Sequence, residues 1–316
     1  MRRSRETRRL LAALPFLGPW LVGLAALVVF PFAASLYWSF CRYDLLTPPR
    51  WVGGENYRQL AEELWSGGSF GRALWNTAYY ALLSVPLSIA LGVGLASLLA
   101  QRVCGVAIYR VAWFLPSVLP VVATSVLWVA LVDPQAGLIN AVLGEGLAQG
   151  WLNSTSEAAW PPSWPDQSAT PGRVFGSKDA LVLMSLWGVG NFMVIYLAAI
   201  GDIPESLYEA AKIDRAGPLR RFWAITLPLL TPVIFFNLVM GVIQAAQAFT
   251  QVYLVSDGVG DPAGSTLMLS LHLFLAAFRD LRMGYASAMA WVLFVIVLVV
   301  TAWLFRTARQ WVYYGG

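Results

Sequence analysis

The sequence predicts an all-α integral membrane protein with six transmembrane helices. Hydrophobic residues make up 58% of the 316-residue chain and charged residues only 12%, well below the charged share of a soluble domain. Six stretches without Asp, Glu, Lys or Arg are each long enough to cross a bilayer, which needs about 20 apolar helical residues. Basic residues lie at the ends of these stretches, so the net charge of +4 indicates membrane topology and not a nucleic-acid partner.

The first of the six predicted spans lies within residues 10–41, after a basic segment. Its apolar run is about 30 residues long, whereas a cleaved signal peptide has about 7–15, so we expect a retained helix. A further apolar segment, 266–278, is too short to span and is expected to lie on, or dip into, the outer surface. The remaining spans are predicted at 73–101, 111–132, 180–201, within 222–256 from about Leu229 onward, and 283–305.

The distribution of charges predicts that both termini are cytoplasmic. With the N-terminus inside, 13 of the 21 basic residues fall on the cytoplasmic side and 12 of the 17 acidic residues fall outside. This is the direction of the positive-inside rule, which orients membrane proteins through their short loops.

Three parts of the chain are predicted. Residues 1–72 hold a cytoplasmic tail, the first helix and an outer segment; 73–305 form a core of five transmembrane helices; and 306–316 are a cytoplasmic tail. The core carries an outer insert at 134–178 that is rich in Trp and Pro. Such an insert fits either a partner-binding surface or a spacer, and the sequence favours neither.

Several kinds of chemistry find no support in the sequence. Cys41 and Cys104 are expected on opposite sides of the membrane, which excludes a disulfide between them, and His272 is the single histidine, so no metal site is predicted. No Gly-x-x-x-x-Gly-Lys-Ser/Thr loop is present, so the chain cannot bind ATP in that manner and no cofactor is expected. No carboxylate lies within the predicted spans, which counts against an ion-coupled carrier.

A charged stretch, "PESLYEAAKIDRAGPLRRFWAITLP" at 204–228, interrupts the apolar runs on the predicted cytoplasmic side. Pro204 suits the first turn of a helix and Gly217 its end, so we expect a helix over 205–217 and a second short helix leading into the fifth span. Its small residues flanked by charges suit docking of another protein. An amphipathic loop with Arg220 and Arg221 on lipid phosphates explains the same pattern.

This stretch resembles the EAA motif of permease subunits of binding-protein-dependent ABC importers, especially the maltose- and glycerol-phosphate-type sugar permeases. One position departs from the motif: the family usually has glycine directly after the aspartate, where Arg215 stands, and Gly217 follows two positions later. The resemblance covers nearly the whole chain apart from 134–178, for example at "FLPSVLPVVATSVLW" and "DGVGDPAGSTLML". The matching motif residues are Glu209, Ala210, Ala211, Asp214, Ala216, Phe222, Ile225, Leu227 and Pro228.

The resemblance implies a type I ABC importer permease fold in a bacterial or archaeal plasma membrane, with lipid around it. It implies a non-catalytic transport subunit whose partners are a cytoplasmic ATP-binding-cassette ATPase dimer, a second homologous permease and an extracytoplasmic solute-binding protein. In that family the loop forms a coupling helix that docks in the ATPase. The residues to which this role transfers are Glu209, Ala210, Ala211, Asp214, Gly217 and Arg221.

Uncharged polar residues in two spans are the candidates for a solute path. Gln244, Gln247 and Gln251 recur at three- and four-residue intervals, which places them on one face of a continuous helix. Asn191 and Trp187 lie in the preceding span. Amides are costly in lipid, so this face should look onto protein or a cavity.

Amide groups suit sugar hydroxyls, and an aromatic ring can stack on a sugar. In related permeases the sugar contacts come from these same two helices, which favours import of a sugar or related polyol. Contact between helices of two subunits remains an equal explanation of the amides. A stand-alone carrier or channel for a small polar solute, and a membrane-anchored scaffold, are the alternative functions.

Overall fold

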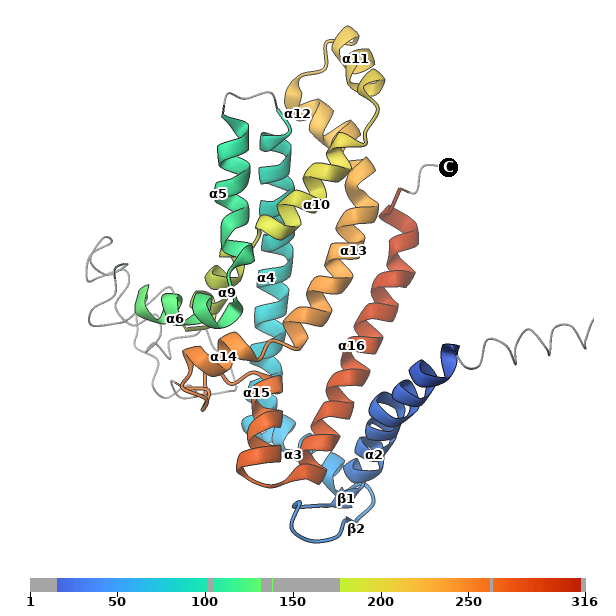
Figure 1. The fold of residues 1–316 in the computed structure, drawn as a ribbon, viewed down its shortest axis with the longest axis vertical. Helices are drawn as coiled ribbons and strands as arrows, with labels where there is room; N and C mark the ends of the chain where they lie inside the picture. The colour runs from blue at the N-terminus through green and yellow to red at the C-terminus, as the bar shows by residue number, and fades with distance from the viewer. Residues whose placement is uncertain (1–15, 102–104, 132–137, 139–176, 262–263, 314–316) are drawn as a thin grey trace, which may run out of the picture. The chain divides into compact units, whose positions relative to one another are not determined.

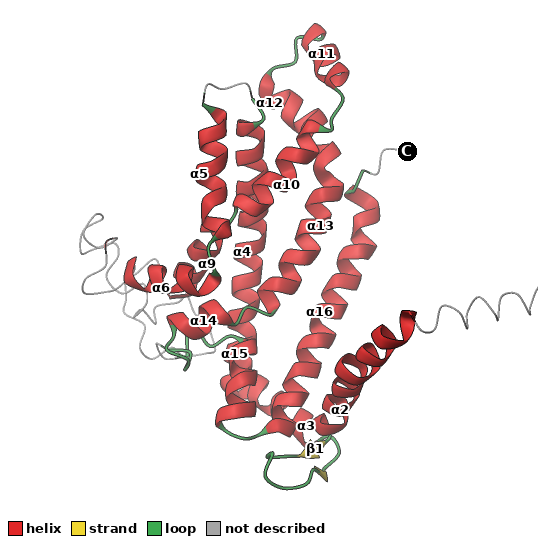
Figure 2. Cartoon of the chain, viewed as in Figure 1, coloured by secondary structure: helices red, strands yellow, loops and turns green. Residues whose placement is uncertain are grey.

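The computed structural model describes residues 16–101, 105–131, 138, 177–261 and 264–313, which are mostly helical (Figures 1 and 2). Contacts divide the chain into two compact units, residues 1–61 with 273–292 and residues 62–272 with 293–316. The predicted division at residues 72 and 305 stays a prediction. Most of the insert at 134–178, together with Cys104, lies outside the described residues.

The first unit is built around the N-terminal apolar helix, Phe16–Ser39. Trp291 donates a hydrogen bond from Nε1 to Ser35 Oγ over 3.2 Å, and its ring lies 4.6 Å from that of Phe32. These contacts attach the helix to the start of the last helix of the chain. The elements that begin here are η1 (Ala25–Val29), α2 (Phe30–Ser39), the antiparallel pair β1 (Cys41–Arg42) and β2 (Arg50–Trp51), and α3 (Glu55–Ser66).

The second unit is organised around α4 (Ser69–Leu99), along which α5, α10 and α13 lie in Figure 1. The elements from α4 to the C-terminus are α5 (Val106–Val118), α6 (Val121–Leu131), α9 (Ser177–Trp187), α10 (Gly190–Gly201), α11 (Glu205–Ile213), α12 (Pro218–Arg221), η2 (Phe222–Thr226), α13 (Leu227–Ala246), α14 (Thr250–Val255), α15 (Leu269–Phe274), η3 (Leu275–Arg279) and α16 (Met283–Trp311).

The core of this unit joins α4, α10 and α13. Tyr196 and Leu230 are completely buried against Val93 and Ala96. Gly92 permits the close approach, because a Cβ there would lie 3.2 Å from the ring of Tyr196. Between helices in a bilayer, such close packing supplies much of the attraction that burial from water supplies in a soluble protein.

The prediction of six membrane-crossing stretches is confirmed in its general form. Four helices are long and apolar enough to cross a membrane, and two bent helix pairs raise the count to as many as six. The prediction of one helix at 111–132 is wrong, since α5 and α6 meet at an angle of 99°. Pro120 explains the bend, because the residue before a proline avoids helical geometry, and Leu119 is extended (φ −68°, ψ 139°).

The single helix predicted at 180–201 is also wrong. It consists of α9 and α10, which meet at an angle of 44° across Gly188 and Val189. Glycine is the residue most easily accommodated where a helix changes direction, and this break falls in the sequence "WGVGN". The short apolar segment predicted at 266–278 is present as the helix Leu269–Arg279.

The fifth span does not continue to residue 256. α13 ends at Ala246, and α14 begins at Thr250. Gln244, Gln247 and Gln251 therefore do not share one face of a continuous helix, and that prediction is wrong. The N–H groups of Gln247 and Ala248 donate to carbonyls three residues earlier, over 3.2 and 3.3 Å, and Phe249 leaves helical geometry (φ −128°, ψ −61°). The Ser270 hydroxyl donates to the Ala248 carbonyl at this point.

Candidate functional site

Two adjoining cavities of about 350 and 390 Å³ lie within the second unit, where the helix breaks come together. Every residue that lines them is uncharged. The walls come from α4, α5, α6, α9, α10, α13 and α14, and they include residues at the breaks between α5 and α6, α9 and α10, and α13 and α14. The residues that line both cavities are Val121, Ser185, Phe192, Asn237, Gln244 and Gln251.

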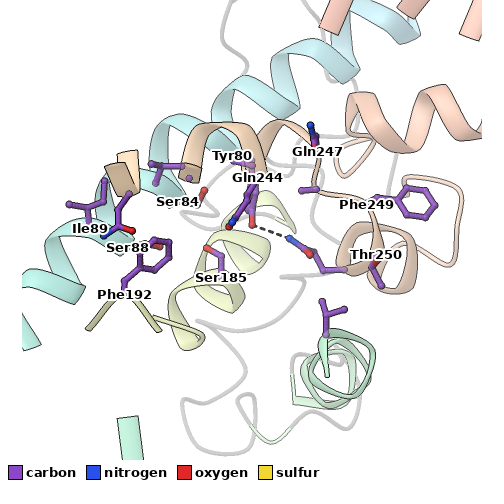
Figure 3. Close-up of a pocket in the computed structure, with 17 residues that line it drawn as sticks. Tyr80, Ser84, Ser88, Ile89, Ser185, Phe192, Gln244, Gln247, Phe249 and Thr250 are labelled. Carbon is purple, nitrogen blue, oxygen red and sulfur yellow. Dashed lines mark hydrogen bonds between the residues drawn. The ribbon is translucent and has the colours of Figure 1, made fainter. Parts of the chain in front are cut away.

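The three predicted glutamines reach this site in different ways (Figure 3). Gln244 and Gln251 line both cavities, and Gln251 donates from Nε2 to the Tyr80 hydroxyl over 3.1 Å. Gln247 lines only the first cavity, and its side chain points away from the group formed by Tyr80, Ser185 and Gln244. The spacing pattern thus identified the right region, although its geometry is not that of a helix face.

The predicted residues of the fourth span line the second cavity from either side of the break between α9 and α10. Trp187, at the end of α9, packs edge-on against Trp128 with 5.9 Å between ring centroids. Asn191, at the start of α10, has an exposed side chain. An aromatic ring and an amide therefore lie together at one wall.

Sequence reasoning missed Asn237, which lies in the middle of α13 and is only 2% exposed. Its Nδ2 atom is buried and makes no well-formed hydrogen bond to a described residue, although the side chain interacts with the Tyr196 hydroxyl. A buried amide donor without a partner costs about 1–3 kcal/mol, so a ligand or water that accepted its hydrogen bond would be favoured. The argument applied to Asn191, an amide within an apolar span, could have found it.

The charged stretch forms α11 at one end of the second unit (Figure 2). The prediction that this helix extends to Gly217 is wrong, because α11 ends at Ile213. Arg215 adopts a left-handed conformation with φ 54°. Its N–H donates to the Lys212 carbonyl over 3.0 Å, and the Ala216 N–H donates to the Ala211 carbonyl over 2.9 Å. These two bonds are the Schellman pattern, which closes helices at a residue that is most often glycine.

Two faces of α11 have different surroundings. The Tyr208 hydroxyl is 2.8 Å from Thr226 Oγ1, which fixes one face of α11 against η2. On another face Leu207 is 43% exposed, and beside it Ala210 and Asp214 are also exposed, while Ala211 is half-buried. An exposed apolar side chain next to small residues leaves this face open to a partner.

The other predicted coupling residues occupy different environments. Glu209 and Gly217 are exposed. Arg221 is half-buried and lines a cavity on the inner side of the α11–α12 segment. The structure therefore separates Arg221 from the exposed face. Among the described residues, no group of three His, Cys, Asp or Glu side chains is placed to share a metal ion.

Residues 65–310 match the family described as "Binding-protein-dependent transport system inner membrane component". The chain is 39% identical over 320 residues to the probable ABC transporter permease protein YesP of Bacillus subtilis (strain 168), covering 99% of this chain and 96% of that protein. It is 33% identical to the sulfoquinovosyl glycerol transport system permease protein SmoG of Agrobacterium fabrum (strain C58 / ATCC 33970), covering 95% and 91%.

A solved structure has the same fold. It is a bacterial alginate ABC transporter in complex with an alginate pentasaccharide-bound periplasmic protein. The TM-score is 0.78 at 20% sequence identity, and the match covers 98% of each chain. This likeness shows that the two chains share a fold.

Proposed function

The chain belongs to the binding-protein-dependent inner membrane components of ABC transporters, and on this premise we propose that it forms half of an ATP-driven import path for a sugar or related polyol. The permease itself is not the catalyst in this proposal, since ATP is hydrolysed by a partner subunit. Members of the family are transport permease subunits, which is consistent with that division of labour.

The observation that carries the proposal is the pair of uncharged cavities at the helix breaks. Amides from Asn191, Gln244 and Gln251 can each donate to, and accept from, a hydroxyl group. Phe192 and Trp187 add apolar surface beside them. Polar and apolar residues contribute comparable shares of the two linings, which suits a solute that carries several hydroxyl groups on an apolar ring. SmoG is named for the transport of sulfoquinovosyl glycerol, and the solved structure is of an alginate transporter. Both names favour a sugar or a related compound as the solute.

We further propose that the segment 204–228 couples the ATPase to this path. α11 is held to η2 by the bond from Tyr208 to Thr226, and η2 continues directly into α13, which carries Gln244. A push on α11 would therefore act on the helix that lines the cavities. The exposed face of Leu207 and Ala210 is the surface that an ATPase would contact.

The expected partners are an ATPase dimer, a second homologous permease and an extracytoplasmic solute-binding protein. Both termini and Arg215 would then face the cytoplasm, and Trp160 the outside. Labelling of single cysteines at positions 215 and 160 in a cysteine-free protein measures this directly. External labelling at position 215 would exclude the proposed topology.

The coupling role is tested by Glu209→Ala and Ala211→Trp in reconstituted vesicles. At Ala211 a large side chain should overpack a close interface by about 1–3 kcal/mol. At Glu209 truncation should leave a partner group unpaired across the interface. Both variants are expected to lower solute uptake relative to solute-stimulated ATPase activity, or to release the ATPase, while the binding protein keeps its solute.

The matched control is Ser206→Ala, an exposed position on the same helix, which should leave uptake unchanged. Normal uptake and ATPase activity in both test variants would remove the coupling role. If the protein were instead a stand-alone carrier, purification in detergent would yield it without any nucleotide-binding subunit.

A further inference from the structure

A larger cavity, of about 960 Å³, lies on the inner side of the α11–α12 segment, away from the two cavities of the proposed solute path. Its walls are the ends of α4, α5 and α10 together with α11, α12 and η2. It shares no lining residue with the uncharged cavities. Unlike them it is lined by charged side chains: Arg110, Arg221 and Glu205.

The two arginines give this cavity a positive charge and N–H donors that are not all used in hydrogen bonds. Arg221 Nε is buried without a hydrogen-bond partner among the described residues. Arg110 is exposed and uses Nη2 to donate to the Leu99 carbonyl over 2.9 Å, which occupies one of its five N–H donors. Glu205 can balance one of the two charges but not both. A buried guanidinium donor without an acceptor is costly, so the cavity favours an anion with several oxygens.

An apolar stripe runs from the same place along α5. Ile108, Val111, Leu115 and Val118 are each between 59% and 74% exposed. Their spacing of three, four and three residues puts them on one side of the helix. Arg110 precedes Val111 and so projects about 100° from it around the helix, which places the cationic cavity beside the apolar stripe and not on the same face.

We propose that this cavity binds the phosphate of an anionic phospholipid, with an acyl chain along the stripe of α5. The combination of two guanidinium groups with an adjacent exposed apolar face matches a molecule that is anionic at one end and apolar at the other. Arg220, the neighbour of Arg221, is exposed and does not line the cavity. The site thus distinguishes two adjacent arginines that the sequence treats alike.

Placing the bound lipid in the cytoplasmic leaflet rests on the proposed function and its topology, whereas the binding itself does not. The bound phosphate would lie beneath Tyr208 and Glu205, on the inner face of α11. It would therefore support the segment that the ATPase is proposed to contact.

The test measures lipid retention by native mass spectrometry after the permease, with whatever subunits co-purify, is extracted from nanodiscs of dioleoyl phosphatidylglycerol or dioleoyl phosphatidylcholine. We expect at least one retained phosphatidylglycerol and weaker retention of the zwitterionic lipid. Arg110→Gln and Arg221→Gln should each lower phosphatidylglycerol retention about five- to tenfold. Arg220→Gln, which removes the same charge from the same short helix, should leave it unchanged.

Two further arms keep the proposal falsifiable. If a glutamine variant does not fold, Arg221→Lys retains the charge and should keep the preference for phosphatidylglycerol. Soluble glycerol 3-phosphate at millimolar concentration should not displace the lipid, and displacement would assign the site to a free phosphate instead. Equal loss in Arg220→Gln, or equal retention of both lipids, would overturn the proposal. Retention is read without transport or ATP, so failure of the importer function would not imitate failure of the lipid site.

Discussion

The α11–α12 turn and the break between α13 and α14 both interrupt helical chain in the second unit, but they are held in opposite ways. The turn at Arg215 is closed by backbone bonds to Ala211 and Lys212, no more than five residues away. The break after Ala246 has backbone bonds from Gln247 and Ala248 to carbonyls three residues earlier, but its side-chain bonds come from far away in the chain. Ser270 bonds Ala248 from 22 residues away, and Tyr80 bonds Gln251 from 171 residues away.

This difference shows why the two regions suit different tasks. A turn closed by its own backbone keeps its shape when its surroundings change, which is what a helix that transmits movement requires. The break also makes side-chain contacts with α4 and with Ser270, so the cavity beside it depends on the packing of the unit as well as on the local backbone. Substitutions at the break between α13 and α14 should therefore change the stability of the whole unit. Substitutions at the α11–α12 turn should change only local backbone strain.

The largest effect is expected for Gly190→Ala, beside the break between α9 and α10. A Cβ at Gly190 would collide with the Trp113 carbonyl oxygen and lie 2.7 Å from Phe114 Cα, and backbone cannot move aside cheaply. We expect a loss of about 3 kcal/mol, measured as a lower thermal midpoint of the detergent-purified complex, together with loss of uptake. Gly94→Ala is the control, because a Cβ there meets nothing within 4 Å. An unchanged midpoint for Gly190→Ala would mean that α5 and α10 do not pack this closely.

Asn76→Ala should produce the next largest effect, since it removes long-range support for the same region. Asn76 is 1% exposed and donates to the carbonyls of Gly264 and Leu267 over 2.9 and 3.0 Å. Leaving these acceptors without their donor should cost about 2 kcal/mol, again read from the thermal midpoint. Ser97→Ala, whose hydroxyl bonds only the Val93 carbonyl of its own helix, should cost less than about 0.5 kcal/mol. If the thermal midpoint fell by a similar amount in Asn76→Ala and Ser97→Ala, the hydrogen bonds from α4 to the 264–267 segment would make no special contribution to stability.

Residues that signal structure locally explain what the sequence could predict. Pro204 and the alanines of α11 located that helix, and the segment 266–278, present as the helix Leu269–Arg279, was recognised from its apolar composition and its length. Pro120 and Gly188 mark two of the helix breaks, and these signals were available in the sequence but were outweighed by the apolar runs around them.

The break after Ala246 had no such signal. The sequence "QAAQAFTQ" contains neither glycine nor proline, and its helical pattern is overridden by partners far away in the chain. The same limitation applies to the candidate site. Composition could indicate which amides are unusual in an apolar span, but only the fold determines which of them meet in a cavity. It also determines that Arg221 and Arg220 differ.

The glutamines allow a comparison within the break itself. Gln244 lines both cavities, whereas Gln247 points away from the polar group beside it. Gln244→Leu should therefore lower the rate of solute uptake about tenfold, the equivalent of about 1.4 kcal/mol for lost hydrogen bonding. Gln247→Leu should stay within about twofold of the wild type. Both measurements are made on complexes that remain assembled. Loss of assembly in Gln244→Leu would instead support contact between helices, and equal losses of uptake would restore the single face that the spacing predicted.

The smallest effect concerns the turn that needs no distant partner. Arg215 occupies a left-handed conformation, φ 54°, which costs a residue with a Cβ about 1 kcal/mol relative to glycine. Arg215→Gly restores the residue usual in the EAA motif and should relieve this strain. Because its two bonding N–H groups belong to the backbone, the Schellman closure should persist, and the thermal midpoint should rise by about 2 °C.

Gly217→Ala is the matched control for that substitution. Gly217 has an ordinary φ of −67°, and a Cβ added there would meet nothing within 4 Å, so the midpoint should change by less than about 1 °C. Uptake should be unaffected in Arg215→Gly if the charge of Arg215 makes no contact with the ATPase. A fall in uptake for Arg215→Gly but not for Arg215→Lys would show that this chain uses a cation where the EAA motif that the segment resembles has a glycine. A fall in the midpoint would show that the left-handed turn carries no strain, and that α11 is closed by more than its own backbone.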